Sequence, residues 1–355
     1  MNRDNKYMKR CLELAKLGKG NTYPNPMVGS VIVYQDTIIG EGYHKIYGEA
    51  HAEVNAINSV KNKELLKHST IYVNLEPCSH YGKTPPCANL IASKKIPNVV
   101  IGNIDISSKV SGKGIEILKN ASCNVTTGIL EKECKDLNKR FFTFQEKKRP
   151  YIILKWAQSS DGFIDKKRKP NDGKIPVWLT NDYARTIVHK WRAEEQSILV
   201  GTNTAILDNP NLNIRNWRGK NPLRIVFDKN LILSQKLNIF NNEAQTLIIA
   251  DNSVKNKTIQ IQNKNIGIEF ADFQKDITYQ LLNILYRKNI HSVIVEGGAK
   301  TLSNFIKNNI WDEARIFISI KELKNGVKAP TIKTDKAIKQ LQLANNKLII
   351  VKNNN

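Results

Sequence analysis

The chain has 355 residues, 41% of them hydrophobic, and a formal net charge of +23. This length exceeds the usual size of a single hydrophobic core and predicts two domains. The five cysteines are odd in number and scattered, which argues against the disulfide framework of a small secreted domain. No stretch approaches the roughly 18 uninterrupted apolar residues of a membrane span, so we expect a cytoplasmic protein without a membrane partner.

The positive charge is spread along the whole chain and is not concentrated in one segment. Because nucleic-acid binding needs lysines and arginines gathered on one face, we expect no nucleic-acid partner. The same charge favours a small phosphorylated substrate. A homo-oligomer is the common default for a protein of this kind.

Short β-branched segments alternate with helical ones in the first half of the chain. The patterns predict helices at 6–18, 51–60 and 88–96, a hairpin over 28–44, and strands at 69–77 and 99–105. This order is typical of a layered α/β fold. A charged run at 145–150 then ends in a proline. We therefore expect two domains, residues 1–146 and 147–355.

The second half repeats the alternation and predicts a second α/β domain. Strands are expected at 151–158, 197–201, 223–228, 246–250 and 291–298, with helices at 181–195, 278–289 and 301–309. The segment after Trp311 carries no pattern from which we infer a role.

One histidine and two cysteines in the first half form a candidate zinc ligand set: His51, Cys78 and Cys87. Three protein ligands leave a fourth zinc position open for water, which is typical of catalytic sites. Glu53 follows His51 by two residues, a spacing that does not share a helix face, so we expect it to carry protons without binding the metal. Cys87 opens a predicted helix, and the helix dipole there favours its thiolate.

These segments, HAEVNA and LEPCSHYGKTPPC, resemble the cytidine-deaminase superfamily and specifically its riboflavin-biosynthesis branch. Eight residues separate the two cysteines, whereas nucleic-acid base deaminases have two. The resemblance implies a cytidine-deaminase-like three-layer α/β/α domain that holds one zinc ion and deaminates a pyrimidine. It also implies a substrate pocket formed by Asn25, His44, His80, Lys83 and Asp105. The chain departs from the family after Asp105, where Ser107 stands in place of an asparagine.

In the second half, VWLTNDYAR, ILVGTNTAILDNPNLNIR and VIVEGG resemble the riboflavin-pathway reductases, whose fold is like dihydrofolate reductase. No G-x-G-x-x-G follows a predicted strand, which disfavours an ordinary Rossmann dehydrogenase. The two glycines of VIVEGG precede a predicted helix, so backbone N–H groups there can approach a phosphate.

The reductase resemblance also implies two sets of binding residues. The NADPH site would comprise Ala157, Trp178, Thr204, Asp208, Gly298, Ala299, Lys300, Thr301, Leu302, Ser303 and Asn304. The sugar-phosphate substrate would be held by Lys155, Arg192, Leu212, Arg215 and Glu296. The chain departs from the family at Pro176, Asn209 and Lys229.

The sequence thus predicts a bifunctional riboflavin-biosynthesis enzyme. Its first reaction would be zinc-dependent hydrolytic deamination of 2,5-diamino-6-ribosylamino-4(3H)-pyrimidinone 5′-phosphate. NADPH reduction of the ribosyl side chain would follow and give 5-amino-6-ribitylaminouracil 5′-phosphate. Two alternatives stay open: a nucleic-acid-editing zinc deaminase with an accessory domain, and an active deaminase whose reductase domain has lost its activity.

Overall fold

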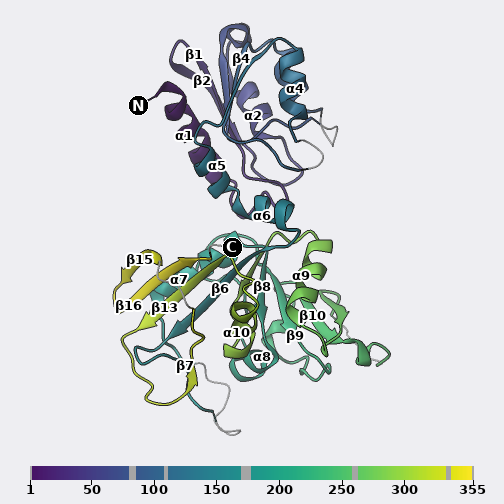
Figure 1. Cartoon of the computed structure of the whole chain (residues 1–355), viewed down its shortest axis with the longest axis vertical. Helices are drawn as coiled ribbons and strands as arrows, with labels where there is room; N and C mark the ends of the chain where they lie inside the picture. Colours follow the sequence, from purple (N-terminus) through teal and green to yellow (C-terminus); the bar gives the residue numbers. More distant parts are fainter. Residues whose placement is uncertain are drawn as a thin grey trace. The chain divides into compact units, whose positions relative to one another are not determined.

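The computed structural model describes residues 2–79, 85–107, 111–168, 177–257, 263–332 and 337–353. The chain divides into two compact units, residues 1–148 and 149–355 (Figure 1). Each unit has its own sheet and its own hydrophobic core. None of the helices in these described ranges combines the length and the apolar character needed to cross a bilayer.

The first unit is built on a five-stranded sheet in the order β2-β1-β3-β4-β5. The hairpin β1–β2 and the pair β1–β3 are antiparallel, and the remaining pairs are parallel. The strands are β1 (Gly29–Tyr34), β2 (Thr37–Tyr43), β3 (Thr70–Val73), β4 (Asn98–Ile101) and β5 (Asn124–Thr127). The helices are α1 (Arg3–Lys16), α2 (Ala52–Ser59), η1 (Lys63–His68), α3 (Cys87–Ser93), α4 (Lys113–Asn120), α5 (Glu131–Leu137) and α6 (Lys139–Lys147).

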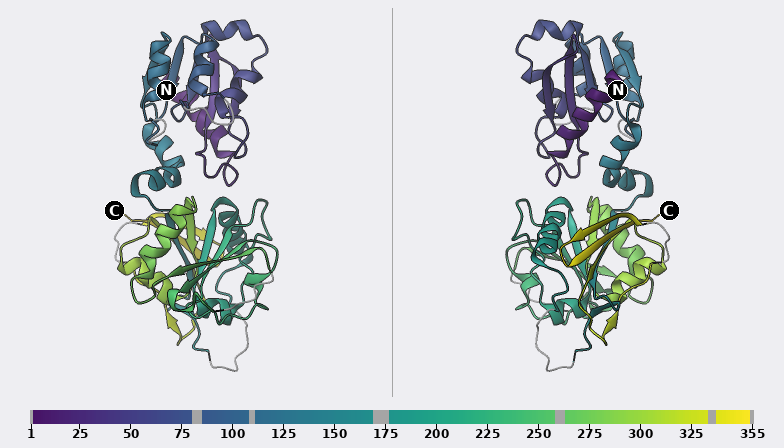
Figure 2. Two further views of the ribbon diagram at one scale, coloured as in Figure 1. Left: turned by 90° about the vertical axis from the view of Figure 1, so that its right-hand side faces the viewer. Right: turned by 90° about the vertical axis from the view of Figure 1, so that its left-hand side faces the viewer.

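Helices cover both faces of this sheet (Figure 2). Because side chains alternate along a strand, Ile71 and Val73 of β3 pack into the cluster formed with α2 and α3, whereas Tyr72 packs into the cluster formed with α1. These two cores on opposite faces of one sheet confirm the expected α/β/α layering.

The second unit has a nine-stranded sheet in the order β11-β10-β9-β8-β12-β6-β13-β16-β15, parallel from β11 to β13 and antiparallel beyond. Its strands are β6 (Tyr151–Gln158), β8 (Ser197–Val200), β9 (Leu223–Phe227), β10 (Thr246–Asp251), β11 (Ile266–Ala271), β12 (Ser292–Val295), β13 (Glu313–Ser319), β15 (Ala337–Leu343) and β16 (Asn346–Lys352). A separate pair joins β7 (Phe163–Asp165) to β14 (Val327–Lys328).

Four α-helices and two short 3₁₀ helices accompany this sheet: α7 (Asp182–Glu194), α8 (Thr202–Asp208), η2 (Asn238–Phe240), η3 (Asn252–Val254), α9 (Ile277–Arg287) and α10 (Ala299–Lys307). Alternate residues of β6 again enter two cores. Ile153 packs in the cluster that includes α7, and Ile152 and Leu154 pack in the cluster that includes α9 and α10. The α/β class expected for this half is confirmed.

One sequence expectation needs correction, and two segments to which the sequence assigned no element have regular structure. The strand expected at 69–77 ends at Val73, and the following residues form a loop. Residues 145–147 of the charged run form the last turn of α6. The phenylalanines of this helix pack inward, and its lysines face solvent. The segment after Trp311 begins with β13, which lies inside the sheet between β6 and β16.

Arg224 of β9 is fully buried, and its guanidinium holds the loop that follows η2. It donates hydrogen bonds to the backbone carbonyls of Asn238, Asn241 and Ala244. Arg224→Met should leave these carbonyls without that donor and lower the unfolding free energy by about 3 kcal/mol or more. For a unit of this size we expect the melting temperature to fall by roughly 6–12 °C in calorimetry. An unchanged melting temperature would show that the loop does not depend on Arg224.

Candidate active sites

The three expected zinc ligands lie together at the starts of two helices. His51 is the N-cap residue of α2, and Cys87 is the first residue of α3. Cys78 lies in the loop after β3. Both cysteine Sγ atoms approach Nδ1 of His51, Cys78 at 3.5 Å and Cys87 at 3.4 Å. All three candidate ligand atoms lie within 4.8 Å of one another.

The spacing of these atoms fits a tetrahedral zinc ion. Zinc–sulfur bonds of about 2.3 Å and zinc–nitrogen bonds of about 2.0–2.1 Å at tetrahedral angles place sulfur and nitrogen about 3.6 Å apart. The two sulfur–nitrogen distances above agree with that value. The residues present can therefore hold zinc through one nitrogen and two sulfurs, with a fourth position for water.

Glu53 is in the first turn of α2 and is only 3% exposed. Burial raises the pKa of its carboxyl group to about 7, and the nearby Cys78 sulfur adds to that rise. A carboxyl group with a pKa near neutrality can both accept and donate a proton at physiological pH. The group is therefore suited to the proton transfers of a hydrolytic reaction.

The sequence predicted a favoured thiolate at Cys87, but the structure favours the thiolate of Cys78. In the absence of a metal, the hydrogen bond from Cys87 lowers the pKa of Cys78 well below its ordinary value. The pKa of Cys87 is raised, first by its role as the donor to Cys78 and then by burial. The start of α3 instead stabilises the Cys78 thiolate, because the backbone N–H of Cys87 donates to the Cys78 sulfur at 3.3 Å.

Asn25 and His44 lie in contact beside the zinc ligands. Nδ2 of Asn25 is 3.1 Å from Nε2 of His44, whose other ring nitrogen is 3.2 Å from the carbonyl oxygen of Ala50. Since a carbonyl only accepts, Nδ1 of His44 carries the hydrogen and Nε2 accepts from the Asn25 amide. The His44 and His51 rings meet edge to face at 5.3 Å between centroids.

The other expected deaminase residues have different positions. Asp105 is 7% exposed, and its carboxylate accepts the backbone N–H of Ser107 at 2.7 Å. His80 and Lys83 lie outside the described residues. Glu76 was not expected as part of this region. Its carboxylate accepts backbone N–H groups of Asp105, Gly112 and Gly114, which anchors the segment next to Cys78.

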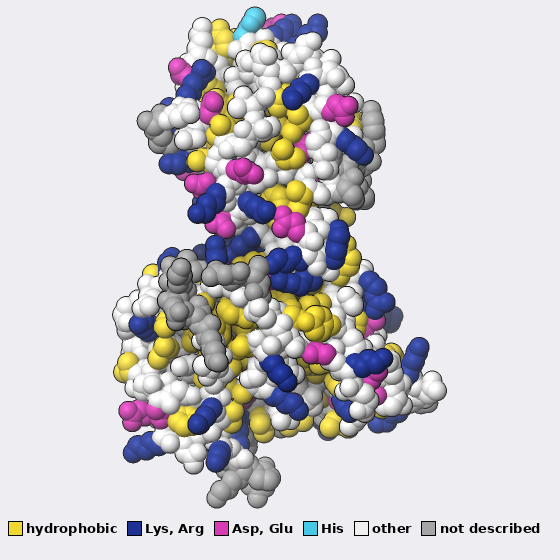
Figure 3. Space-filling model, viewed as in Figure 1, with side chains coloured by type: hydrophobic (Ala, Val, Ile, Leu, Met, Phe, Trp, Pro, Cys, Tyr) yellow, Lys and Arg dark blue, Asp and Glu magenta, His cyan; other side chains and the backbone are white. Residues whose placement is uncertain are grey.

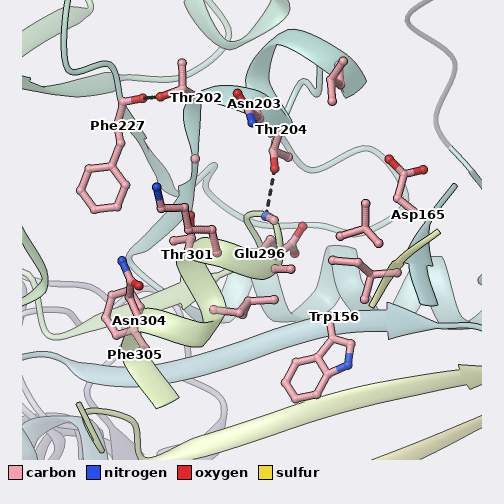
Figure 4. A pocket seen from close by; sticks show the side chains of 18 of the residues that line it. Trp156, Asp165, Thr202, Asn203, Thr204, Phe227, Glu296, Thr301, Asn304 and Phe305 are labelled. Carbon is pink, nitrogen blue, oxygen red and sulfur yellow. Dashed lines mark hydrogen bonds between the residues drawn. The ribbon is translucent and has the colours of Figure 1, made fainter. Parts of the chain in front are cut away.

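The second unit contains a cavity of about 920 Å³ at the carboxyl ends of its parallel strands (Figure 4). Of the expected NADPH residues, those lining it are Ala157, Thr204, Asp208, Gly298, Ala299, Lys300, Thr301, Leu302 and Asn304. Trp178 and Ser303 are not among the described lining residues. Trp178 is 52% exposed and lies 4.7 Å from the Arg185 guanidinium, and Ser303 is on the exposed side of α10.

In the turn between β12 and α10, the backbone at Gly297 lies close to the backbone at Gly201, as the two glycines of the motif predict. A Cβ atom at Gly297 would lie 2.4 Å from the backbone nitrogen of Gly201, so a side chain there cannot be accommodated. Gly298 donates its N–H to the Thr204 hydroxyl at 2.9 Å, a contact seen in Figure 4. The start of α10 therefore faces the cavity, where its N–H groups favour an anion.

Three of the expected substrate residues form a buried ionic group at the edge of this cavity. Arg192 donates to Glu296 at 2.9 Å, and the Lys155 ammonium is 3.9 Å from the same carboxylate oxygen. Burial alone raises the pKa of Glu296, but the charges of Arg192 and Lys155 outweigh it, and the pKa is lowered. Among the described residues, the other carboxylate oxygen of Glu296 has no hydrogen-bond partner.

The remaining expected substrate residues are on the loop after α8. Leu212 is buried with a left-handed φ of 52°, and the Arg215 side chain bonds the Asn213 amide oxygen at 2.7 Å. The pKa of Arg215 is lowered, first by burial and then by the charge of Arg192. The two guanidinium groups therefore lie near each other. Of the two residues where the chain departs from the family here, Asn209 caps η2 through its side chain, and Lys229 lines the cavity. Pro176 lies outside the described residues.

Sequence reasoning missed two features of this unit. Phe227 and Phe273 line the cavity, with ring centroids 6.2 Å apart and the rings at right angles. An aromatic residue at or just after the end of a strand is equally common in an ordinary core, so the sequence did not single them out. His189 is buried three residues before Arg192 on α7. That spacing, which places both side chains on one helix face, was the signal available for it.

The two halves of the chain match two known families. Residues 1–103 match the cytidine and deoxycytidylate deaminase zinc-binding region, and residues 150–349 match the RibD C-terminal domain. With the zinc-type site in one unit and the large cavity in the other, these matches define a zinc deaminase joined to a reductase.

Similar proteins cover almost the whole chain. It is 38% identical to the riboflavin biosynthesis protein RibD of Aquifex aeolicus over 91% of this chain and 89% of that protein. It is 39% identical to RibD of Bacillus amyloliquefaciens over 92% of this chain and 86% of that protein. A crystal structure of a diaminohydroxyphosphoribosylaminopyrimidine deaminase/5-amino-6-(5-phosphoribosylamino)uracil reductase from Thermotoga maritima matches with a TM-score of 0.87 and 34% identity, covering 99% of both chains.

The chain belongs to the RibD family of riboflavin biosynthesis proteins. It is accordingly a bifunctional deaminase and reductase with a zinc-binding deaminase domain, and its cofactors are zinc and NADPH. The fold, the function and the cofactors expected from the sequence are confirmed. The roles of individual site residues stay predictions.

Proposed function

We propose that residues 1–146 deaminate 2,5-diamino-6-ribosylamino-4(3H)-pyrimidinone 5′-phosphate and that residues 147–355 then reduce its ribosyl side chain. The observation that carries the first step is the convergence of His51, Cys78 and Cys87 beside the buried Glu53. The similarity to the Thermotoga maritima deaminase/reductase supports both reactions and their substrates.

In the proposed deamination, Glu53 transfers protons and Asn25 holds the pyrimidine. Bound zinc lowers the pKa of a coordinated water toward neutrality. Glu53 would accept one proton of the attacking water and deliver it to the ring nitrogen, and would then carry the second proton to the amine that leaves as ammonia. Since Nδ2 of Asn25 is engaged by His44, its amide oxygen can accept an N–H of the ring.

In the proposed reduction, Glu296 and Lys155 surround the reacting sugar. NADPH bound in the cavity would supply a hydride to the anomeric carbon of the opened ribose. The carboxylate oxygen of Glu296 without a partner can accept a sugar hydroxyl, and Lys155 can supply a proton as the ring opens. Burial lowers the pKa of Lys155, which eases that proton transfer.

The alternative substrate is a nucleic acid, and the net charge of +23 is the observation that favours it. Figure 3 shows acidic and basic side chains interspersed on the visible face of the unit of residues 1–148, which does not favour a nucleic-acid surface there. Purified zinc-loaded protein should release ammonia from the diaminopyrimidine phosphate and none from cytidine- or adenosine-containing RNA or DNA. The reverse pattern would refute the proposed substrate.

We further propose a cytoplasmic location. Cys78 and Cys87 must stay reduced to bind zinc, and the cytoplasm keeps thiols reduced. The five cysteines are free thiols in the structure.

Arg215 is proposed to bind the substrate phosphate because it is an exposed residue whose guanidinium lies near that of Arg192. Arg215→Ala should raise the KM for the phosphorylated substrate by about 10- to 100-fold, since charge-assisted bonds to a phosphate are among the strong ones. The dissociation constant of NADPH should change by less than about twofold. Steady-state kinetics with NADPH titration measures both, and an equal or larger effect on NADPH would move Arg215 to the cofactor site.

A further inference from the structure

His189 lies near both Arg192 and Arg215, and none of the steps proposed above uses it. It is on α7, three residues before Arg192, and is 5% exposed. Its Nδ1 atom is 3.1 Å from the carbonyl oxygen of Asn213. The same nitrogen is 3.3 Å from the backbone nitrogen of Arg215. Nδ1 of His189 therefore contacts both ends of the segment 213–215.

That segment needs contacts from outside to keep its shape. It follows Asn209 and Leu212, two non-glycine residues in the left-handed region with φ of 42° and 52°. Such residues are strained and keep this conformation only when the surroundings determine it. Arg192 supplies one such contact by donating to the carbonyl of Asn213 at 3.2 Å. His189 supplies the second.

The contact of His189 persists in either neutral tautomer. With the hydrogen on Nδ1, the ring donates to the Asn213 carbonyl, and with the hydrogen on Nε2, it accepts the N–H of Arg215. Burial, then the charges of Arg192 and Arg215, lower the pKa of His189 to about 4. The ring is therefore neutral at physiological pH and adds no charge of its own to the arginine pair.

Resting on the proposed function, we propose that His189 is a positioning residue of the sugar-phosphate site. It holds the backbone of Asn213 to Arg215 so that the guanidinium of Arg215 faces the same phosphate as that of Arg192. The Asn213 side chain extends this support, since it accepts from Arg215 and donates to Glu243. Displacing such a segment by about 1 Å is enough to weaken a bidentate phosphate contact severely.

Two substitutions distinguish the effect of the His189 hydrogen bonds from the effect of the shape of its ring. His189→Phe keeps a flat ring and removes both nitrogens, whereas His189→Asn keeps a donor and an acceptor near the position of Nδ1. The neighbouring exposed residue provides the matched control, Lys190→Ala. The probes are ribose 5-phosphate and ribose, titrated by calorimetry into full-length protein with NADPH bound, together with the KM and kcat of the reduction.

We expect His189→Phe to weaken ribose 5-phosphate binding and raise the substrate KM by about 10-fold, with kcat changed less than about threefold. Ribose binding should be unaffected, and His189→Asn and Lys190→Ala should bind ribose 5-phosphate within about threefold of the wild type. Unchanged ribose 5-phosphate binding by His189→Phe, or an equal loss for ribose, would overturn the inference. If the wild type binds ribose 5-phosphate but does not oxidise NADPH, the proposed reduction fails while the role of His189 is still decided by the binding data.

Discussion

Glu53→Gln is expected to keep its zinc and to lose ammonia release by about three orders of magnitude. The carboxyl group is buried at the start of α2, next to the three candidate ligands but outside the set they form. Glutamine has nearly the same shape, so the metal site should survive. It cannot carry a proton between water, ring nitrogen and leaving amine, and only that transfer is removed.

Zinc content by atomic absorption and ammonia release by a coupled assay measure the two quantities on the same sample. Glu64→Gln is a suitable control, because Glu64 is an exposed carboxylate of the same unit that pairs with Lys67. Ammonia release within about tenfold of the wild type would show that another group moves the proton.

Cys87→Ala is expected to remove most of the bound zinc and with it the deaminase activity. Only His51 and Cys78 would then remain of the three candidate ligands, and catalytic zinc sites have three protein ligands. The reductase should keep its activity on the deaminated substrate, because Arg149–Asn355 is a separate compact unit with its own core.

The matched control for this change is Cys123→Ala. Cys123 is a buried cysteine of the same unit that packs in the hydrophobic core and bonds the carbonyl of Ile96. It should keep its zinc and its ammonia release at a modest cost in stability. Retention of a full equivalent of zinc by Cys87→Ala would mean that the third ligand is a different residue.

The sequence predicted the zinc set because its chemistry is local. His51 and Cys87 stand at helix starts, which the proline and the apolar pattern indicated, and their residue types admit few other uses together. The favoured thiolate at Cys87 was predicted wrongly. The structure favours the thiolate of Cys78, because Cys78 accepts hydrogen bonds from Cys87, nine residues later, across a loop whose course the pattern does not define.

The features that were missed depend on contacts between distant segments. In the loop before Cys78, the carboxylate of Glu76 accepts backbone N–H groups 36 and 38 residues later in the chain. His189 gains its role from a loop 24 residues away. The segment after Trp311 enters the sheet only through pairing of β13 with β6. Local periodicity does not show which distant segment each of these residues contacts.

The central claim is that both units act in turn on one metabolite, and a single assay with two readouts tests it. Zinc-loaded protein receives 2,5-diamino-6-ribosylamino-4(3H)-pyrimidinone 5′-phosphate without NADPH, and ammonia is followed until release stops. NADPH is then added, and its absorbance at the nicotinamide band is recorded. We predict one equivalent of ammonia followed by oxidation of one equivalent of NADPH. Ammonia without NADPH oxidation would contradict the second activity, and the absence of both would contradict the account as a whole.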